Sequence, residues 1–368
     1  MFNSHIAPII GVILAWSMAF AQPSAPPDPE SIGSLRGARI AYQTDGKPIP
    51  LTYIAAGLSD DQLADLKPLA PNVTVINVDS REGAFDHAAE AHGVDARLIT
   101  SDFLGAADRL VWAQSPSAGV NWILENEALR TDPDIVLTNM RAVHGPAIAD
   151  HAFAMLLTLT RSMRIHDANK AAGTWDRSAA EGKSIALEGR TMFVVGLGGI
   201  GSEIAKRAHG FGMRVIATRR SDQPRPDYVD EQGLSSDFAR FLPQADVVAI
   251  CLPLTDETEH LVDTAAFDAM KPGAYLINIA RGRIVDTDAL LAALDSGRLA
   301  GACLDVTDPE PLPAGHPLWS QPNVVITPHT AADATLTDER WWALYRENIR
   351  RFGAGEPLLN TVDKQAGY

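Results

Sequence analysis

Positive charge and cysteine are both scarce in this sequence of 368 residues. The 31 Lys and Arg residues are outnumbered by 46 Asp and Glu residues, which gives a formal net charge of −15. Such a charge argues against nucleic acid or an anionic membrane as a partner, because phosphates are repelled. The two cysteines, Cys251 and Cys303, are too few for a disulfide framework or a thiolate zinc site, and we predict no metal site. A hydrophobic fraction of 46 % and room for two domains indicate a globular protein.

Apolar runs long enough to span a bilayer are also absent after the N-terminus. Residues 6–20 are uncharged and mostly apolar, but this run is short for a membrane span and typical of a signal-peptide core. It ends in the A-x-A pattern of residues 19–21, and a Pro-rich stretch follows. We therefore expect residues 1–21 to be a cleaved signal peptide and 22–36 a linker, with a periplasmic or secreted product. The alternatives are an uncleaved anchor or an extension of a cytoplasmic protein.

Beyond the linker, short apolar strands alternate with helical patterns, which predicts βαβ units and parallel sheets. We predict two Rossmann-like, doubly wound parallel-sheet domains with a cleft between them. Residues 37–145, completed by 332–368, form the substrate-binding domain, and residues 146–331 form the dinucleotide-binding domain. Strands are predicted at 39–43, 72–78, 110–114, 134–139, 191–198, 214–219, 246–252, 274–280, 301–306 and 323–328, and helices at 59–70, 120–130, 146–163, 200–211 and 338–352.

A glycine-rich turn joins the strand predicted at 191–198 to the helix that follows it. Its G-x-G-x-x-G pattern consists of Gly196, Leu197, Gly198, Gly199, Ile200 and Gly201. The first glycine permits a tight turn, the second lets a pyrophosphate approach the backbone, and the third allows the helix to pack closely on the strand. The helix N-terminus adds amide donors for the anion. With its strand–turn–helix context, this motif predicts dinucleotide binding.

The residues at the end of the next strand indicate which dinucleotide is bound. NAD-binding domains usually carry an acidic residue there, about 20 residues after the motif, to bond the ribose hydroxyls. This chain has Arg219 and Arg220 instead, and Asp222 lies beyond the predicted end of the strand. Two guanidinium groups suit a 2′-phosphate, so we expect NADP rather than NAD.

Several longer stretches resemble the D-isomer-specific 2-hydroxyacid dehydrogenase family, over most of the chain from about residue 41 to residue 352. They occur in the family's order and spacing: LEGRTMFVVGLGGIGSEIAKRAHGFGMRV, LPLTDETEHLV, NIARGRIVDTDALLAAL, GACLDVTDPEPLP and VVITPHTA. The resemblance implies an NAD(P)-dependent oxidoreductase acting on CH–OH donors, and it implies a homodimer.

The family's catalytic residues fall on Arg281, Glu310 and His329. A forked guanidinium such as Arg281 fixes the carboxylate of a 2-oxo acid through two hydrogen bonds. Imidazole gives or takes the hydroxyl proton near neutral pH, which is the role implied for His329. A carboxylate on that imidazole, implied for Glu310, orients it and favours its protonated form.

The resemblance also implies binding residues around these three. The loop that holds the substrate carboxylate falls on Ser117, Ala118 and Gly119, the phosphate-lining segment on Leu252, Pro253 and Thr258, and the nicotinamide end on Ala280 and Asp305. His151 follows Asp150 where the family has a Glu-His pair, and this departure gives the pair no catalytic role here.

Together these features predict hydride transfer between nicotinamide C4 and C2 of a small 2-oxo or 2-hydroxy acid. The substrate stays undefined, with glyoxylate, hydroxypyruvate or another short 2-oxo acid as the default. The alternative is an exported or regulatory binding protein that keeps the dehydrogenase fold without its chemistry.

Overall fold

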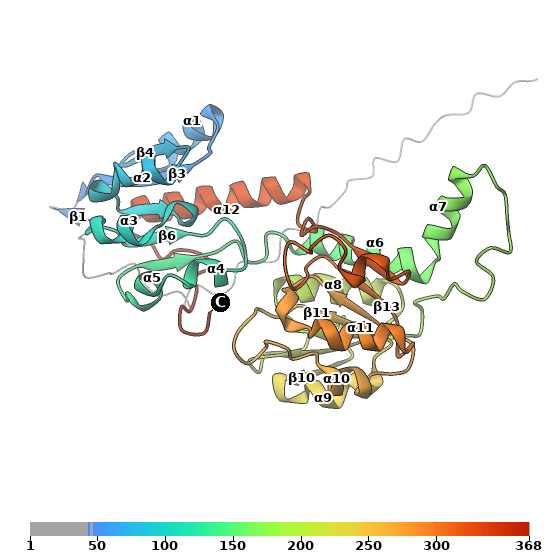
Figure 1. Ribbon diagram of the computed structural model, residues 1–368. Helices are drawn as coiled ribbons and strands as arrows, with labels where there is room; N and C mark the ends of the chain where they lie inside the picture. The colour runs from blue at the N-terminus through green and yellow to red at the C-terminus, as the bar shows by residue number, and fades with distance from the viewer. Residues whose placement is uncertain (1–42, 45–46, 368) are drawn as a thin grey trace, which may run out of the picture.

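The computed structural model describes residues 43–44 and 47–367, which form two α/β lobes (Figure 1). The predicted signal peptide and linker lie outside the described residues, as does nearly all of the strand predicted at 39–43. Within the described part of the chain, no helix combines the length and apolar character needed to cross a bilayer.

The larger lobe is built on a sheet of seven parallel strands. In spatial order they are β10 (Glu231–Leu234), β9 (Arg214–Arg219), β8 (Thr191–Val195), β11 (Val247–Ile250), β12 (Ala274–Asn278), β13 (Leu299–Leu304) and β14 (Val324–Ile326). Every residue of β8, β11 and β12 is buried, because helices cover both faces of the sheet, and this explains their continuous apolar sequences. The chain order reverses between β8 and β11, where open α/β sheets bind their ligands.

Helices cover the two faces of this sheet and form two separate cores. They are α6 (Gly145–Thr160), α8 (Gly199–Gly210), α9 (Phe238–Phe241), α10 (Thr264–Ala269) and α11 (Thr287–Asp295). Phe193 and Leu276 belong to the core with residues of α10 and α11, whereas Met192 and Ile277 belong to the core with residues of α6 and α8. Successive strand residues therefore alternate between the two cores.

The smaller lobe is built on five parallel strands in the order β4-β3-β5-β6-β7. They are β4 (Val73–Val78), β3 (Leu51–Ala56), β5 (Gly93–Asp95), β6 (Trp112–Gln114) and β7 (Val136–Thr138), preceded by the short pair β1 (Gln43–Thr44) and β2 (Lys47–Pro48). Its first five helices are α1 (Asp60–Leu69), α2 (Arg81–Phe85), α3 (Ser101–Ala106), α4 (Asn121–Leu124) and α5 (Glu127–Thr131). The predicted class of two doubly wound parallel-sheet domains is confirmed, and we keep the limits 37–145 with 332–368, and 146–331, as a proposed division.

One predicted helix is wrong in its continuity. Residues 120–130 form α4 and α5 rather than a single helix, because Asn126 interrupts them. Asn126 has an extended backbone, and its side-chain oxygen accepts the N–H of Leu129 at 3.3 Å. This N-cap starts a new helix and so ends the previous one.

The last helix, α12 (Thr335–Ala354), returns to the smaller lobe and completes its core. Tyr345, Ile349 and Phe352 are buried there with residues of β3 and β6. At the surface, Trp342 Nε1 donates to Asp65 Oδ2 of α1 at 3.1 Å. The smaller lobe thus consists of two stretches of chain separated by the whole of the larger one.

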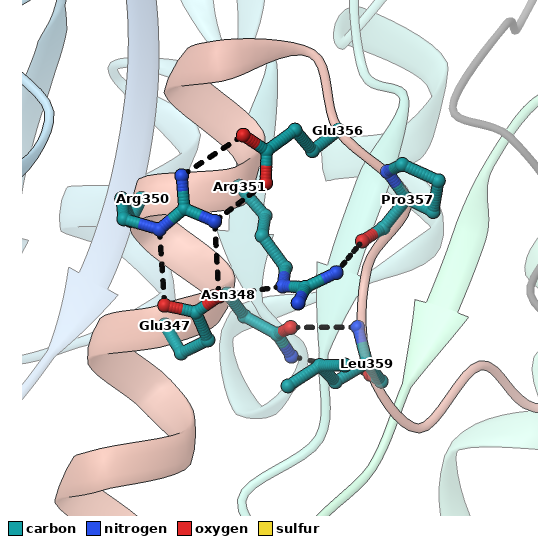
Figure 2. Close-up of polar contacts among 7 residues, drawn as sticks. All are labelled: Glu347, Asn348, Arg350, Arg351, Glu356, Pro357 and Leu359. Carbon is teal, nitrogen blue, oxygen red and sulfur yellow. Dashed lines mark hydrogen bonds and ion pairs between the residues drawn. The ribbon is translucent and has the colours of Figure 1, made fainter. Parts of the chain in front are cut away.

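The segment after α12 is fastened back onto the helix by a polar network (Figure 2). Arg350 pairs with Glu347 and with Glu356, at 3.0 and 2.5 Å, and Arg351 donates to the carbonyl oxygen of Pro357 at 2.9 Å. Buried Asn348 accepts the N–H of Leu359 at 2.8 Å and donates to Gln114 of β6 at 3.0 Å. Residues beyond this network then bridge to β7, so the C-terminal segment is part of the smaller lobe.

The connection between the lobes, from the end of β7 to the start of α6, lies against the glycine-rich turn. Ala142 and Gly145 lie against the turn, since a Cβ on Gly199 would be 3.0 Å from Cα of Ala142, and one on Gly145 would be 3.0 Å from the oxygen of Gly199.

At the other end of α6, helix α7 (Met163–Ala171) projects from the larger lobe (Figure 1). The loop after α7 carries Trp175, whose side chain is 93 % exposed.

Candidate active site

The predicted acid–base pair is formed in the structure. Nδ1 of His329 lies 2.6 Å from Oε1 of Glu310, a distance typical of a charge-assisted hydrogen bond. Both side chains are partly exposed, at 47 % and 41 %, so a substrate can reach them. Because Nδ1 is bonded to the carboxylate, Nε2 is the ring nitrogen left for a reacting group.

Asp305 holds the backbone that carries this histidine. His329 has a φ of +57°, in the left-handed region that non-glycine residues rarely adopt. Its N–H donates to the carbonyl oxygen of Asp305 at 2.8 Å. The N–H groups of Thr330 and Ala331 donate to the Asp305 carboxylate at 3.0 and 3.1 Å. Asp305 is only 3 % exposed, and these bonds fix the unusual conformation at His329.

His151 belongs to the shell behind this loop. Thr327 Oγ1 donates to Asp305 Oδ1 at 2.6 Å, and His151 Nε2 lies 2.9 Å from the same hydroxyl. The hydroxyl proton is already used, so His151 Nε2 is the donor in the second bond. The neighbouring Asp150 turns away and pairs with Arg207 at 2.6 Å. His151 therefore contacts the loop through Thr327 and does not contact the His329–Glu310 pair.

Arg281 reaches from the larger lobe to the smaller one. It follows β12, and its Nε donates to Asn121 Oδ1 of α4 at 3.2 Å while Nη1 donates to the carbonyl oxygen of Ala280 at 2.6 Å. A Cβ on Gly119 would lie only 1.8 Å from Nη2, so glycine is required there for the guanidinium to fit. Burial lowers the pKa of Arg281, and the nearby Glu310 carboxylate offsets part of this effect. The guanidinium stays charged at any physiological pH.

The loop of residues 117–119 presents backbone N–H groups next to this guanidinium. Its carbonyl oxygens are occupied: that of Ser117 accepts the N–H of Met140, that of Ala118 accepts Asn139 Nδ2, and that of Gly119 accepts Ser117 Oγ. Among the described residues, nothing accepts the N–H groups of Ala118 and Gly119. A guanidinium and two backbone N–H groups without an acceptor in the described part of the chain therefore lie in neighbouring positions, a combination that suits a small carboxylate.

The glycine-rich turn fits a dinucleotide pyrophosphate. Gly196 has a φ of +101°, and a Cβ there would lie 2.8 Å from the carbonyl oxygen of Cys251. A Cβ on Gly201 would lie 2.0 Å from the carbonyl oxygen of Gly196, so any larger residue would push α8 off the strand. Gly198 is exposed, with open space around its Cβ position, and the first amides of α8 follow it.

The predicted phosphate-lining segment lies beside this turn. Leu252 Cδ2 would be 2.9 Å from a Cβ on Gly196, and Pro253 follows it. Thr258 fixes the loop, because its Oγ1 donates to the carbonyl oxygen of Pro253 at 2.7 Å and accepts the N–H of Thr255 at 2.8 Å. Ala280 is nearly buried next to Arg281. These predicted cofactor residues thus lie at the carboxyl ends of the neighbouring strands β8, β11 and β12.

Positive charge gathers at the end of β9. Arg219 is the last residue of that strand, and its buried Nε has no partner among the described residues, although Nη2 donates to Gln223 at 2.5 Å. Arg220 is exposed, and its charge adds to burial in lowering the pKa of Arg141, which follows β7. The sequence did not indicate Arg141. These three residues suit a phosphate group, whereas exposed Asp222 lies beyond the strand end.

The two cysteines take no part in the site. Cys303 is fully buried on β13, and Cys251 directly follows β11. Burial raises the pKa of both thiols, so each stays protonated and unreactive. Both side chains pack in the same core of the larger lobe.

Comparison with known proteins gives a family to set beside this geometry. Residues 153–331 match the family model described as "D-isomer specific 2-hydroxyacid dehydrogenase, NAD binding domain". The chain is 38 % identical to the glyoxylate reductase of Thermococcus litoralis over 240 residues, which is 64 % of this chain and 72 % of the relative.

Solved structures agree with this over almost their whole length. The D-isomer specific 2-hydroxyacid dehydrogenase family protein of Aeromonas salmonicida superposes with a TM-score of 0.74 at 33 % identity, covering 86 % of this chain and 99 % of that one. The D-isomer specific 2-hydroxyacid dehydrogenase of Xanthobacter autotrophicus Py2, solved with NADPH and MES, has a TM-score of 0.73 at 29 % identity, covering 87 % and 100 %. Both lobes therefore have counterparts in these proteins.

Proposed function

Because this chain belongs to the D-isomer-specific 2-hydroxyacid dehydrogenase family, whose members are NAD(P)-dependent oxidoreductases, we propose that it reduces short 2-oxo acids with NADPH. The observation that carries this proposal is the 2.6 Å contact between Glu310 and His329, formed beside an Arg281 that lies against the 117–119 loop. An acid–base pair next to a carboxylate clamp suits a 2-oxo acid, in which the carboxylate adjoins the reacting carbon.

In the proposed mechanism, Arg281 and the N–H groups of Ala118 and Gly119 bind the substrate carboxylate. The oxygen on C2 then faces His329 Nε2, which supplies its proton, while Nδ1 keeps its bond to Glu310. The Glu310 carboxylate stabilises the protonated ring before transfer and orients it. Arg281 also polarises the C2 carbonyl. The nicotinamide, when bound, supplies the hydride to C2.

The proposed preference for NADP rests on Arg219 and Arg220, which occupy the end of β9 where NAD-dependent relatives usually carry an acid. The unpartnered Nε of Arg219 and the nearby Arg141 support it. The predicted contacts of Leu252, Pro253, Thr258, Ala280 and Asp305 with the cofactor are part of the same proposal.

The direct test is a panel of 2-oxo acids, including glyoxylate and hydroxypyruvate, assayed in parallel with NADPH and NADH. We expect oxidation of NADPH with at least one of them and slower oxidation of NADH. If neither reduced cofactor is consumed with any member of the panel, the reductase proposal fails and the fold serves binding alone.

We further propose a homodimer in which the arm formed by α7 and the loop to Trp175 contacts a second copy. An indole that is 93 % exposed in the loop after a projecting helix supports this, because Trp side chains are enriched in protein–protein interfaces. Light scattering should give a dimer mass, and Trp175→Ser should weaken the association. A monomer for the unchanged chain would contradict it.

Export remains part of the proposal through residues 1–21, whose uncharged core and A-x-A site favour cleavage after Ala21. N-terminal sequencing of the protein from its own host should begin at Gln22. A product that retains Met1 would contradict the signal peptide.

A further inference from the structure

A cavity of about 340 Å³ lies in the smaller lobe, at the carboxyl ends of β3, β5 and β6. It adjoins the proposed active site at two places. Its lining includes Pro116, which directly precedes the 117–119 loop, and Ala332, which is three residues after His329. The cavity is therefore within reach of a chain that extends from a carboxylate held by that loop, and it has the size of an ordinary small-molecule site.

Part of the cavity wall is apolar and firmly held. Leu58, Pro116 and Trp341 line it. Trp341 Nε1 donates to the carbonyl oxygen of Pro116 at 3.1 Å, and its ring stacks on Tyr345 with the ring centroids 4.9 Å apart. The indole is therefore fixed in place by an adjoining strand end and by its own helix. A hydrocarbon chain entering the cavity would bury apolar surface against this wall.

The charged side chains that line the cavity leave an excess of negative charge there. Arg97 lines it, but this guanidinium donates to both oxygens of buried Asp95, at 3.0 and 2.7 Å, and that pairing raises its pKa. Burial lowers the pKa of His144, so this ring is neutral near pH 7. Asp333 and Asp338 also line the cavity and are exposed, and neither forms an ion pair with another described residue. Two carboxylates thus remain without a compensating charge.

We propose that this cavity binds the remote end of the 2-oxo acid and selects an uncharged chain over one that ends in a carboxylate or phosphate. The proposal rests on the proposed function, since Arg281 and the 117–119 loop must hold the first carboxylate. A second anion would lie near Asp333 and Asp338 with no free cation to bind it, because Arg97 is already paired with Asp95. An uncharged chain meets no such repulsion and gains the apolar wall.

The test compares two acids of equal chain length, 2-oxopentanoate and 2-oxoglutarate. Each is titrated calorimetrically into the full chain saturated with NADP⁺, with which the 2-oxo acids cannot react. We expect 2-oxopentanoate to bind about tenfold more tightly than 2-oxoglutarate. This is the order of magnitude of the repulsion between the second carboxylate of 2-oxoglutarate and the partly screened charges of Asp333 and Asp338. In the double variant Asp333→Asn with Asp338→Asn, the ratio of the two affinities should fall to about one.

Glu339→Gln is the matched control. It removes one negative charge from an exposed position next to Asp338, on the same turn of α12 but outside the cavity lining, so the affinity ratio should stay as in the unchanged protein. Asp338 lies in the first turn of α12, where an acid stabilises the helix. Asp333 lies before the helix begins, so Asp333→Asn does not remove this stabilisation. Asp333→Asn alone should also lower the affinity ratio if repulsion is the cause.

Three results would overturn the inference: equal or tighter binding of 2-oxoglutarate, no binding of either acid, or an affinity ratio that the double variant leaves unchanged. Failure of the reductase proposal shows up separately. In that case NADPH is not oxidised with glyoxylate or with 2-oxopentanoate, while the calorimetric ratio still decides what the cavity selects.

Discussion

The two ends of the proposed active site are built from different parts of the chain. The pyrophosphate side of the cofactor end consists largely of backbone, in which Gly196 permits the turn, Gly198 leaves room for an anion, and Gly201 lets α8 pack against the strand. The substrate end consists of side chains, and Arg281 must reach from one lobe to a loop of the other. The glycine-rich turn is therefore local in sequence, whereas the substrate end exists only once both lobes are folded.

This difference predicts that substitutions will separate the two ends. Changes at the substrate end should abolish or slow turnover while NADPH still binds, and changes at the end of β9 should alter the choice of cofactor while the substrate still binds. The variants below test this separation, from the largest expected effect to the smallest.

Replacing His329 with Ala removes the proposed proton donor, and we expect kcat to fall about a thousandfold. The dissociation constant of NADPH, measured by its fluorescence, should stay within about twofold because the glycine-rich turn is untouched. His87→Ala is a matched control, since His87 also pairs with a glutamate at 2.6 Å but lies away from the site. Loss of NADPH binding in the His329 variant would contradict the separation.

Replacing Arg281 with Lys keeps the charge but loses the forked geometry, and we expect kcat/KM for glyoxylate to fall about a hundredfold. Most of the loss should be in KM if the guanidinium chiefly binds the carboxylate. Arg283→Lys is the control. This exposed arginine lies two residues after Arg281 and pairs with Glu259. An unchanged KM for the Arg281 variant would remove the clamp from the mechanism.

Replacing Glu310 with Gln keeps the shape but removes the charge beside His329, and we expect kcat to fall about tenfold. Without the carboxylate, the bond to Nδ1 of His329 loses its charge assistance, so the imidazole is oriented less firmly. Glu90→Gln makes the same change in the exposed pair with His87 and should leave kcat as it was. An unchanged kcat for Glu310→Gln would remove Glu310 from the proposed mechanism.

Replacing Arg219 and Arg220 together with Gln should lower the preference for NADPH over NADH about tenfold, with KM for the 2-oxo acid unchanged. Arg214→Gln, at the other end of β9 and paired with Glu231, is the control for loss of charge on the same strand. If NADH and NADPH are affected equally, the two arginines do not bind a 2′-phosphate.

The sequence predicted the strands of the larger lobe well, apart from β10, because they are continuous apolar runs bounded by glycines and charged residues. The runs that form β8, β9, β11 and β12 need no tertiary information to be recognised. In the smaller lobe, β3 was missed although it lies inside the sheet, and β5 spans only Gly93–Asp95, too short for any periodicity to appear. Asn126 interrupts a predicted helix because its side chain caps α5. The sequence does not reveal this cap, because polar residues such as Asn are also common outside helices.

The site was predicted unevenly for the same reason. Glu310 and His329 are 19 residues apart and were paired through the family resemblance, and the structure places them in contact. Nothing in the sequence indicates that Gly119 must be glycine, because the atom that would clash belongs to Arg281 in the other lobe. Arg141 and the cavity beside Trp341 were missed too, since each depends on segments that only folding brings together.

The return of α12 to the smaller lobe has a consequence for how the chain acquires its structure. The strands of the larger lobe are complete once residue 326 has been synthesised, and its sheet pairs with no strand that comes later among the described residues. The core of the smaller lobe still lacks Tyr345, Ile349 and Phe352 at that stage, and its edge at β7 lacks the segment that reaches Thr361. We therefore expect the second lobe in the chain to fold first, because the apolar surface of the first lobe stays uncovered until the last residues of the protein are made.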